Sequence, residues 1–325
     1  MKNARIIFMG TPDFAVASLK KLVENDFNII GVITAPDKPA GRGKKIQMSA
    51  VKEYALEKGL NILQPTNLKA VDFIEKLKNL KPDLQIVVAF RMLPEIVWSL
   101  PPLGTFNLHA SLLPQYRGAA PINHAIINGE KITGVTTFFL NKEIDKGAII
   151  DKKEVEILAE DNAGSLHDKL MEVGSDLLIE TTKNILSNNF ELVEQEKIIE
   201  NDENLKEAPK IFKEFCEINW HDEMEKIQNF IRGLSPYPGA YTNIQNGKDE
   251  EIFFKILKTE KEILRHDFPI GNIITNNKNM IKVSVKEGFI NILELQMMGK
   301  RRMNTKEFLN GFNFFSNNSL FIIKN

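Results

Sequence analysis

The sequence predicts an α/β protein whose first half folds around a mainly parallel sheet and whose last third forms a smaller, strand-rich domain. Three observations predict this class. Short, nearly unbroken apolar runs alternate with helix-like segments up to residue 186, which is typical of parallel strands covered on both faces. A polar stretch then interrupts this alternation. The residues beyond it form short strand-like runs separated by Asn- and Gly-containing turns, a pattern that favours a small β-barrel or sandwich.

The first half contains seven predicted strands and five predicted helices. The strands are short runs rich in Ile, Val and Phe, over residues 6–9, 28–34, 61–63, 84–89, 106–108, 133–140 and 149–157. The helices show apolar residues at helical spacing, over residues 14–23, 49–58, 68–79, 121–127 and 163–186. Gly10 ends the first strand and Gly59 ends the second helix, as expected for residues that punctuate regular structure.

The polar stretch over residues 187–207 has few core anchors, which predicts a linker between two domains. After it we expect one helix over residues 222–232 and strands over 239–244, 251–257, 271–275, 280–285, 289–296 and 320–323. The predicted domains are therefore residues 1–188 and 208–325, joined by residues 189–207. The length of 325 residues suits about two domains, each large enough to bury its own core.

Composition excludes several classes of protein. The formal net charge is −1, so the chain is not a polycation, although a local basic patch stays possible. The single cysteine, Cys216, excludes an intramolecular disulfide, and no histidine has partners at metal-ligand spacing, so we predict no metal site. No apolar run is long enough to span a bilayer, and the N-terminus enters a strand-like segment directly. We therefore expect a reduced, cytoplasmic protein without a membrane anchor.

The turn after the first strand, Gly10 to Asp13, is one candidate for a ligand-facing loop. A glycine-bearing strand-to-helix turn brings backbone N–H groups near an anion. The second and third glycines of a dinucleotide fingerprint are absent, so NAD binding is poorly supported. A tight turn capped by Asp13 explains the same residues equally well.

Asn107 and His109 form a stronger candidate site. They end a predicted strand, where an open α/β sheet places its ligand crevice, and residues two apart on a strand point to the same side. This pair suits acyl transfer, because an amide N–H stabilises a tetrahedral oxyanion and an imidazole accepts the proton of an attacking amine. Asp145, in a later turn, would orient the imidazole and raise its pKa. Each of these residues alone is also ordinary turn or strand-end chemistry.

Two basic clusters lie elsewhere in the sequence. Residues 38–45 form a Gly- and Pro-rich loop with four cations, and Lys300, Arg301 and Arg302 form the second cluster. A solvated face is the default explanation for such runs. A flexible basic loop beside an active-site edge also suits a phosphate backbone.

The motifs together carry a resemblance to a known family. The segment Asn107-x-His109-x-Ser111-Leu112-Leu113-Pro114, followed by Arg117-Gly118-Ala119-Ala120-Pro121-Ile122 and Asp145-x-Gly147, resembles the 10-formyltetrahydrofolate-dependent formyltransferases. Segments 8–15, 36–45, 208–210, 231–240 and 299–303 are similar to the members of that family that act on initiator tRNA. The resemblance covers nearly the whole chain. Two stretches depart from the usual pattern, namely residues 89–94 and Lys146.

The resemblance implies a Rossmann-like catalytic domain over residues 1–188 and a C-terminal, tRNA-contacting domain similar to an OB-fold β-barrel. It implies formyl transfer from 10-formyltetrahydrofolate, a co-substrate rather than a bound cofactor, to the α-amino group of methionyl initiator tRNA. The implied partners are the folate and the tRNA, with no sign of a protein partner. The implied residues are Asn107, His109 and Asp145 for catalysis, Ser111, Leu112, Leu113 and Pro114 for the folate, and Arg42, Lys44 and Lys45 for the tRNA.

Two rival functions stay open on the sequence. A formyltransferase for an amino-sugar nucleotide would share the catalytic segment but would not need the basic loop over residues 39–45. A non-enzymatic nucleic-acid-binding protein would use the strand-rich C-terminal half and would leave the pairing of Asn107 with His109 unexplained.

Overall fold

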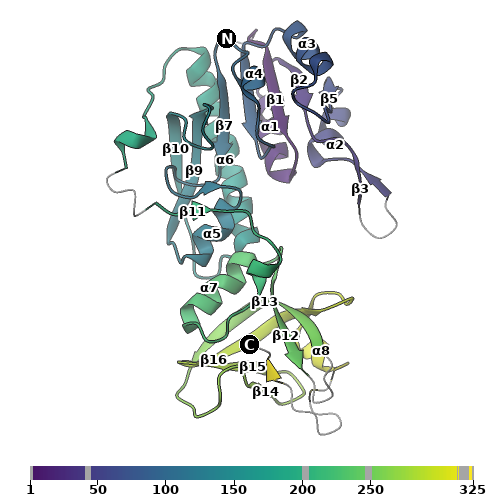
Figure 1. The fold of residues 1–325 in the computed structure, drawn as a ribbon, viewed down its shortest axis with the longest axis vertical. Helices are drawn as coiled ribbons and strands as arrows, with labels where there is room; N and C mark the ends of the chain where they lie inside the picture. The colour runs from purple at the N-terminus through teal and green to yellow at the C-terminus, as the bar shows by residue number, and fades with distance from the viewer. Residues whose placement is uncertain are drawn as a thin grey trace. The chain divides into compact units, whose positions relative to one another are not determined.

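The computed structural model describes residues 3–40, 45–199, 205–245, 251–312, 314 and 322–323. The chain forms two compact units, which are discontinuous in sequence (Figure 1). Unit 1 comprises Met1–Gly118, Ile132–Glu156 and His167–Glu207, and unit 2 comprises Ala119–Lys131, Ile157–Leu166 and Ala208–Asn325. These boundaries differ from the predicted domains, because two segments of the first half belong with the C-terminal unit.

Unit 1 is built on a seven-stranded sheet in the order β10-β9-β7-β6-β1-β2-β5. The five strands from β7 to β5 run parallel, and β9 pairs antiparallel with β7 on one side and with β10 on the other. The prediction of a mainly parallel sheet is therefore confirmed. The strands are β1 (Ile6–Gly10), β2 (Ile29–Ile33), β5 (Ile62–Leu63), β6 (Leu84–Val88), β7 (Thr105–His109), β9 (Ile132–Phe139) and β10 (Ile149–Glu156).

Helices cover both faces of this sheet, which explains why its central strands are apolar on both sides. The helices are α1 (Asp13–Glu24), α2 (Ala50–Glu57), α3 (Val71–Asn79), α4 (Glu95–Trp98) and α6 (Ala163–Leu186). On one face, Ile7 and Met9 of β1 share a core with Phe73 of α3. On the other face, α6 packs so closely on the sheet that a Cβ at Gly174 would lie 3.1 Å from Leu108 of β7.

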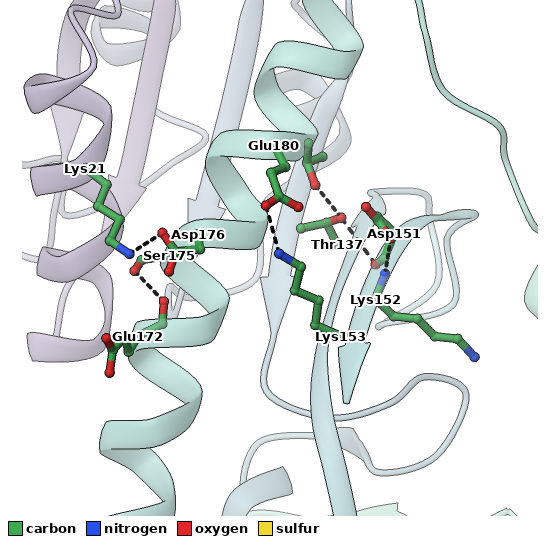
Figure 2. Close-up of polar contacts among 10 residues, drawn as sticks. Lys21, Thr137, Asp151, Lys152, Lys153, Glu172, Ser175, Asp176 and Glu180 are labelled. Atoms are coloured by element: carbon green, nitrogen blue, oxygen red, sulfur yellow. Dashed lines mark hydrogen bonds and ion pairs between the residues drawn. The ribbon is translucent and has the colours of Figure 1, made fainter. Parts of the chain in front are cut away.

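Polar contacts join the long helix α6 to α1 and to the neighbouring strands of the sheet (Figure 2). Asp176 forms an ion pair with Lys21 of α1. Glu180 accepts from Lys153 of β10 at 2.8 Å. At the same level of the helix, the buried hydroxyls of Thr137 and Thr181 lie 2.9 Å apart. The helix is thus held in register with the strands that it covers.

Several short elements were not predicted from the sequence. These are the hairpin β3 (Lys38–Ala40) and β4 (Lys45–Gln47), the helix α8 (Thr305–Leu309), the two-residue strands β8 (Arg117–Gly118), β11 (Glu207–Ala208) and β17 (Met303–Asn304), and the 3-10 turns η1 (Gln195–Lys197) and η3 (Glu214–Cys216). The helix α4 was also missed. Each is too short to show a clear hydrophobic period.

Unit 2 contains an antiparallel sheet in the order β14-β15-β16-β13-β12-β18, with β17 paired to β16. Its elements are α5 (Pro121–Ile127), α7 (Met224–Leu234), β12 (Ala240–Gln245), β13 (Glu251–Ile263), β14 (Ile273–Thr275), β15 (Ile281–Val285), β16 (Gly288–Met297) and β18 (Ile322–Ile323). The core surrounds Trp220, whose indole N–H donates to Thr242 at 3.1 Å. The predicted strand-rich C-terminal part is therefore confirmed. Within the described residues, no helix is both long and apolar enough to cross a membrane.

Candidate active site

The candidate site lies at the carboxyl edge of three adjacent parallel strands. β1, β6 and β7 end at Gly10, Val88 and His109, and β6 lies between the other two. This edge is where open α/β sheets bind their ligands. Gly10 is required there, because a Cβ would lie 2.5 Å from the Cβ of Ala15. Asp13 is the first residue of α1, and the N-cap position is occupied by Pro12, so the predicted cap by Asp13 is wrong.

Asn107 and His109 share one face of β7, as the spacing predicted. Leu108 between them faces α6 on the opposite side. Asn107 is half-buried, and within the described part of the chain its side-chain amide has no hydrogen-bond partner. Its amide group is therefore available to a ligand at this edge.

His109 is almost fully buried, and its ring is fixed by two contacts. Nε2 lies 2.9 Å from the carbonyl oxygen of Tyr116, and the ring packs edge-on against Phe138. A carbonyl only accepts, so Nε2 carries the proton of this hydrogen bond. In the neutral ring Nδ1 then carries the free lone pair.

The segment from Ser111 to Pro114 follows β7 directly and is held by Thr136 of β9. The Thr136 hydroxyl donates to the carbonyl of Ser111 at 2.7 Å and accepts from the N–H of Leu113 at 3.1 Å. Ser111 and Leu113 have buried side chains, and the Ser111 hydroxyl donates to the carbonyl of Gln115. Leu112 and Pro114 are half-buried. The side chains of Ser111 and Leu113 thus belong to the interior of unit 1.

Asp145 lies in the turn between β9 and β10 and adopts a left-handed φ of 54°. Its Oδ2 accepts from the backbone N–H of Gly118 at 3.0 Å. Among the described residues, no hydrogen bond joins Asp145 to His109. Both side chains nevertheless bind the three-residue segment from Tyr116 to Gly118, Asp145 at its end and His109 at its start. The structure thus brings them to one segment of backbone without direct contact.

The neighbours of Asp145 include one residue that the sequence did not single out. Gln195, predicted to lie in the linker, is fully buried and donates to the carbonyls of Asp145 and Gly147, both at 2.8 Å. Lys146, one of the departures from the family pattern, forms an ion pair with Glu143 that lowers the pKa of that carboxyl group. No sequence motif marked Gln195, because its role depends on contacts about fifty positions away.

The other unusual stretch, after β6, lines a surface cleft with residues 66–69. The guanidinium of Arg91 donates to the carbonyl of Thr66 at 2.9 Å and also to that of Pro65. It lies over the ring of Phe90, and partial burial lowers the pKa of Arg91. Met92 is 77% exposed at the mouth of this cleft.

The predicted tRNA-contacting residues fall mostly outside the described chain. Arg42 and Lys44 lie outside the described residues, and Lys45 begins β4 but its side chain is not described. In the second basic cluster, Arg302 pairs with Glu294 and Arg301 lies 3.6 Å from Glu307. Both of these arginines therefore have acidic partners. In the described part of the chain, no group of three His, Cys, Asp or Glu side chains is arranged to hold a metal ion.

Comparison with known sequences extends over both units. Residues 4–182 match the family described as "Formyl transferase", and residues 210–313 match "Formyl transferase, C-terminal domain". A protein of Phocaeicola vulgatus named methionyl-tRNA formyltransferase is 56% identical over 320 residues, which is 98% of this chain and 99% of that protein. A protein of the same name from Bacteroides thetaiotaomicron is 53% identical over 311 residues, 96% of each chain.

Solved structures share the fold at lower identity. An N-formyltransferase from Helicobacter canadensis, in complex with folinic acid and dTDP-3-aminofucose, has a TM-score of 0.63 at 21% identity, over 90% of this chain and 99% of that chain. HypX from Aquifex aeolicus, in complex with tetrahydrofolic acid, has a TM-score of 0.62 at 16% identity. That match covers 96% of this chain, which spans about half the length of HypX. Because residues 4–182 and 210–313 both match this family, the chain belongs to the formyl transferase family.

Proposed function

We propose that this protein transfers a formyl group from 10-formyltetrahydrofolate to the α-amino group of methionine esterified to initiator tRNA. The observation that carries the proposal is an identity of 53–56% over almost the entire chain to proteins named for this reaction. Identity at this level extends through both units, not only through the catalytic motif that all formyltransferases share. The sugar-specific relatives, in contrast, match at only about one fifth identity.

The reaction forms a bond between the amine nitrogen and the formyl carbon and breaks the bond from that carbon to the folate nitrogen. The acceptor amine has an ordinary pKa of ~7.7–8.0, so a weak base is enough to make it nucleophilic. The harder step is to stabilise the oxyanion that forms on attack. The free, half-buried amide of Asn107 is suited to donate to that oxygen.

His109 is proposed to accept the proton that the attacking amine loses. Because Nε2 donates to Tyr116, the free lone pair of the neutral ring is on Nδ1, which is the atom that would accept the proton from the attacking amine. The amine loses one proton and the leaving folate nitrogen gains one, so the overall transfer is balanced. Asp145, which binds the other end of the Tyr116 to Gly118 segment, would help to hold the backbone that orients the ring.

The folate is proposed to lie along residues 111–114 and the cleft beside Arg91. Ser111 and Leu113, whose side chains are buried, would contribute the backbone groups that Thr136 does not bind, and Leu112 and Pro114 would contribute half-buried apolar surface. The exposed Met92 would add apolar surface at the cleft mouth. The folate acts as a co-substrate and is consumed at each turnover.

The tRNA is proposed to bind through the basic loop that contains Arg42, Lys44 and Lys45. The support for this is the sequence of the loop and its likeness to the relatives that use tRNA, since Lys and Arg side chains neutralise phosphate groups. The cytoplasm, where initiator tRNA is charged, is the proposed place of action.

A competition assay tests the proposed function. The protein is incubated with 10-formyltetrahydrofolate, methionyl initiator tRNA and a dTDP-linked amino sugar as competing acceptor. We expect formylmethionyl-tRNA as the product, with the amino sugar unchanged. Formylation of the sugar alone would contradict the proposal in favour of the sugar-nucleotide function. RNA binding without any formyl transfer would favour a non-enzymatic role.

A further inference from the structure

Gln195 is an uncharged polar residue buried within unit 1, in a segment whose composition predicted a linker. After α6 the chain returns along β10, where Val193 and Ile149 exchange two backbone hydrogen bonds of 2.9 Å. This pairing carries Gln195 into the protein, where its exposure is 0%. A buried amide is costly unless all its hydrogen bonds are made, so its partners are informative.

The side chain of Gln195 makes four hydrogen bonds. Nε2 donates to the carbonyls of Asp145 and Gly147, each at 2.8 Å. Oε1 accepts from the Nε and Nη2 atoms of Arg117 at 3.0 and 2.6 Å. Because a guanidinium only donates and a carbonyl only accepts, this amide has a single orientation that satisfies all four bonds.

These bonds close a ring around the turn that holds Asp145. The Asp145 carboxylate accepts from the N–H of Gly118, and Gly118 follows Arg117, which in turn binds Gln195. The turn itself is unusual: Asp145 has a φ of 54°, and a Cβ at Gly147 would lie 1.6 Å from the carbonyl oxygen of Phe139. Such a conformation persists only where its surroundings hold it.

We infer that Gln195 is a positioning residue, which fixes the backbone of the Asp145 turn and thereby the place of its carboxylate in formyl transfer. The inference rests on the proposed function, because it assumes that Asp145 takes part in catalysis. Gln195 acts through Asp145 and does not touch the substrates. Its loss should therefore lower kcat and leave the KM values for folate and tRNA within about twofold.

A double-mutant cycle on the full-length protein tests this inference. The variants are Gln195→Met, Asp145→Ala and the two combined, with kcat and both KM values measured for each. We expect Gln195→Met to lower kcat by about 10²-fold, the size of effect that a small misplacement of a catalytic group produces. The combined variant should be no slower than Asp145→Ala alone, since the two residues act as one unit.

Two further variants keep the test decisive. Gln228→Met makes the same substitution at a half-buried glutamine of unit 2, where it removes two hydrogen bonds to Thr259, and should leave kcat unchanged. Gln195→Glu keeps an acceptor for Arg117 but loses both donated bonds, so it replaces Gln195→Met if that variant does not fold. If the combined variant loses kcat by the product of the two single losses, or if either Gln195 variant keeps the wild-type kcat, the inference about Gln195 is wrong while the proposed function is unaffected. A wild-type kcat for Asp145→Ala would overturn the proposed site as well.

Discussion

Asn107 and His109 differ in how much of their hydrogen-bonding capacity the fold uses. One imidazole nitrogen of His109 donates a hydrogen bond to the carbonyl of Tyr116, while the side-chain amide of Asn107 has no hydrogen-bond partner among the described residues. A half-buried amide at this edge of the sheet is open to water or to a ligand. This difference suggests that Asn107 meets the substrate directly, whereas His109 is oriented by the protein before the substrate arrives.

Replacement of Asn107 by Ala tests this suggestion. We expect kcat for formyl transfer to fall by about 10²–10³-fold, which is typical of losing one oxyanion donor, with the folding stability little changed. Single-turnover formylation measures the effect. Asn291→Ala, at a half-buried strand position in β16 of unit 2, serves as the matched control. Equal rates in the two variants would remove Asn107 from the mechanism.

His124 provides a second test at a single side chain, this time of stability. Burial lowers the pKa of His124, although the hydrogen bond from its Nε2 to the carbonyl of Pro209 partly opposes this shift. The folded state therefore disfavours the charged ring. A lowered histidine pKa means that the unfolded chain binds more protons, so this contribution to stability is complete above pH ~6.5 and is lost as the pH falls below it.

The measurement compares thermal unfolding of the wild type with that of His124→Gln, which cannot titrate in this range. We expect the difference in Tm in favour of the wild type to shrink between pH 7.5 and pH 5.5. Other titrating groups affect both proteins alike and cancel in the difference. A difference that stays constant over this range would show that His124 does not titrate between the folded and unfolded states.

The packing of α5 against α7 depends on one small residue. Gly233 in α7 faces α5, where an added Cβ would lie 2.6 Å from the Cγ1 atom of Ile127 and 3.0 Å from its backbone nitrogen. Asn123 also donates to the carbonyl of Gly233 at 2.8 Å. The two helices therefore approach closely only because position 233 has no side chain.

Gly233→Ala is expected to destabilise unit 2. Overpacking of this kind costs roughly 1–3 kcal/mol, which should lower the Tm by a few degrees. Gly311→Ala is the matched control, since nothing lies within 4 Å of a Cβ at that position. Scanning calorimetry resolves the two cases. If Gly233→Ala matches Gly311→Ala, the helices have room to separate and the close approach is not required.

Helices and strands with a clear apolar period could be predicted from the sequence. The helices over 121–127 and 163–186 coincide with α5 and α6, and the strand expected over 84–89 contains β6. The hairpin of β3 and β4 could not be predicted, because three-residue polar strands have no detectable period. The discontinuous units were also beyond prediction, since a boundary read along the chain assumes that each domain is continuous.

The candidate site was predictable only in part. The shared face of Asn107 and His109 follows from strand alternation, which is a local property. The roles proposed for these residues and for Asp145 remain predictions. The contact of Asp145 with Gly118 and the burial of Gln195 are both non-local. The burial of Gln195 arises from the pairing of the segment after α6 with Ile149 of β10. Composition alone predicted that this polar segment is a linker between domains.

The charge of the molecule as a whole gives no general attraction for nucleic acid, since 42 Lys and Arg residues face 43 Asp and Glu residues. Binding to tRNA must then depend on where a few cations lie. The arginines of the second basic cluster have acidic partners in unit 2, as the contacts of Arg301 and Arg302 show. The loop that contains Arg42, Lys44 and Lys45 is consequently the stronger candidate for phosphate contacts.

The salt dependence of tRNA use tests this assignment for the whole enzyme. When the logarithm of tRNA affinity is plotted against the logarithm of salt concentration, each phosphate contact makes the slope more negative by up to about 0.9, because binding releases a counterion. Arg42→Ala should therefore raise the KM for methionyl-tRNA and reduce the magnitude of this salt slope by about one. The KM for the folate should stay the same. Arg301→Ala, at a cation that already has an acidic partner, should change the slope less. If both variants keep the wild-type slope, the loop is a solvated surface and the tRNA is held by other residues.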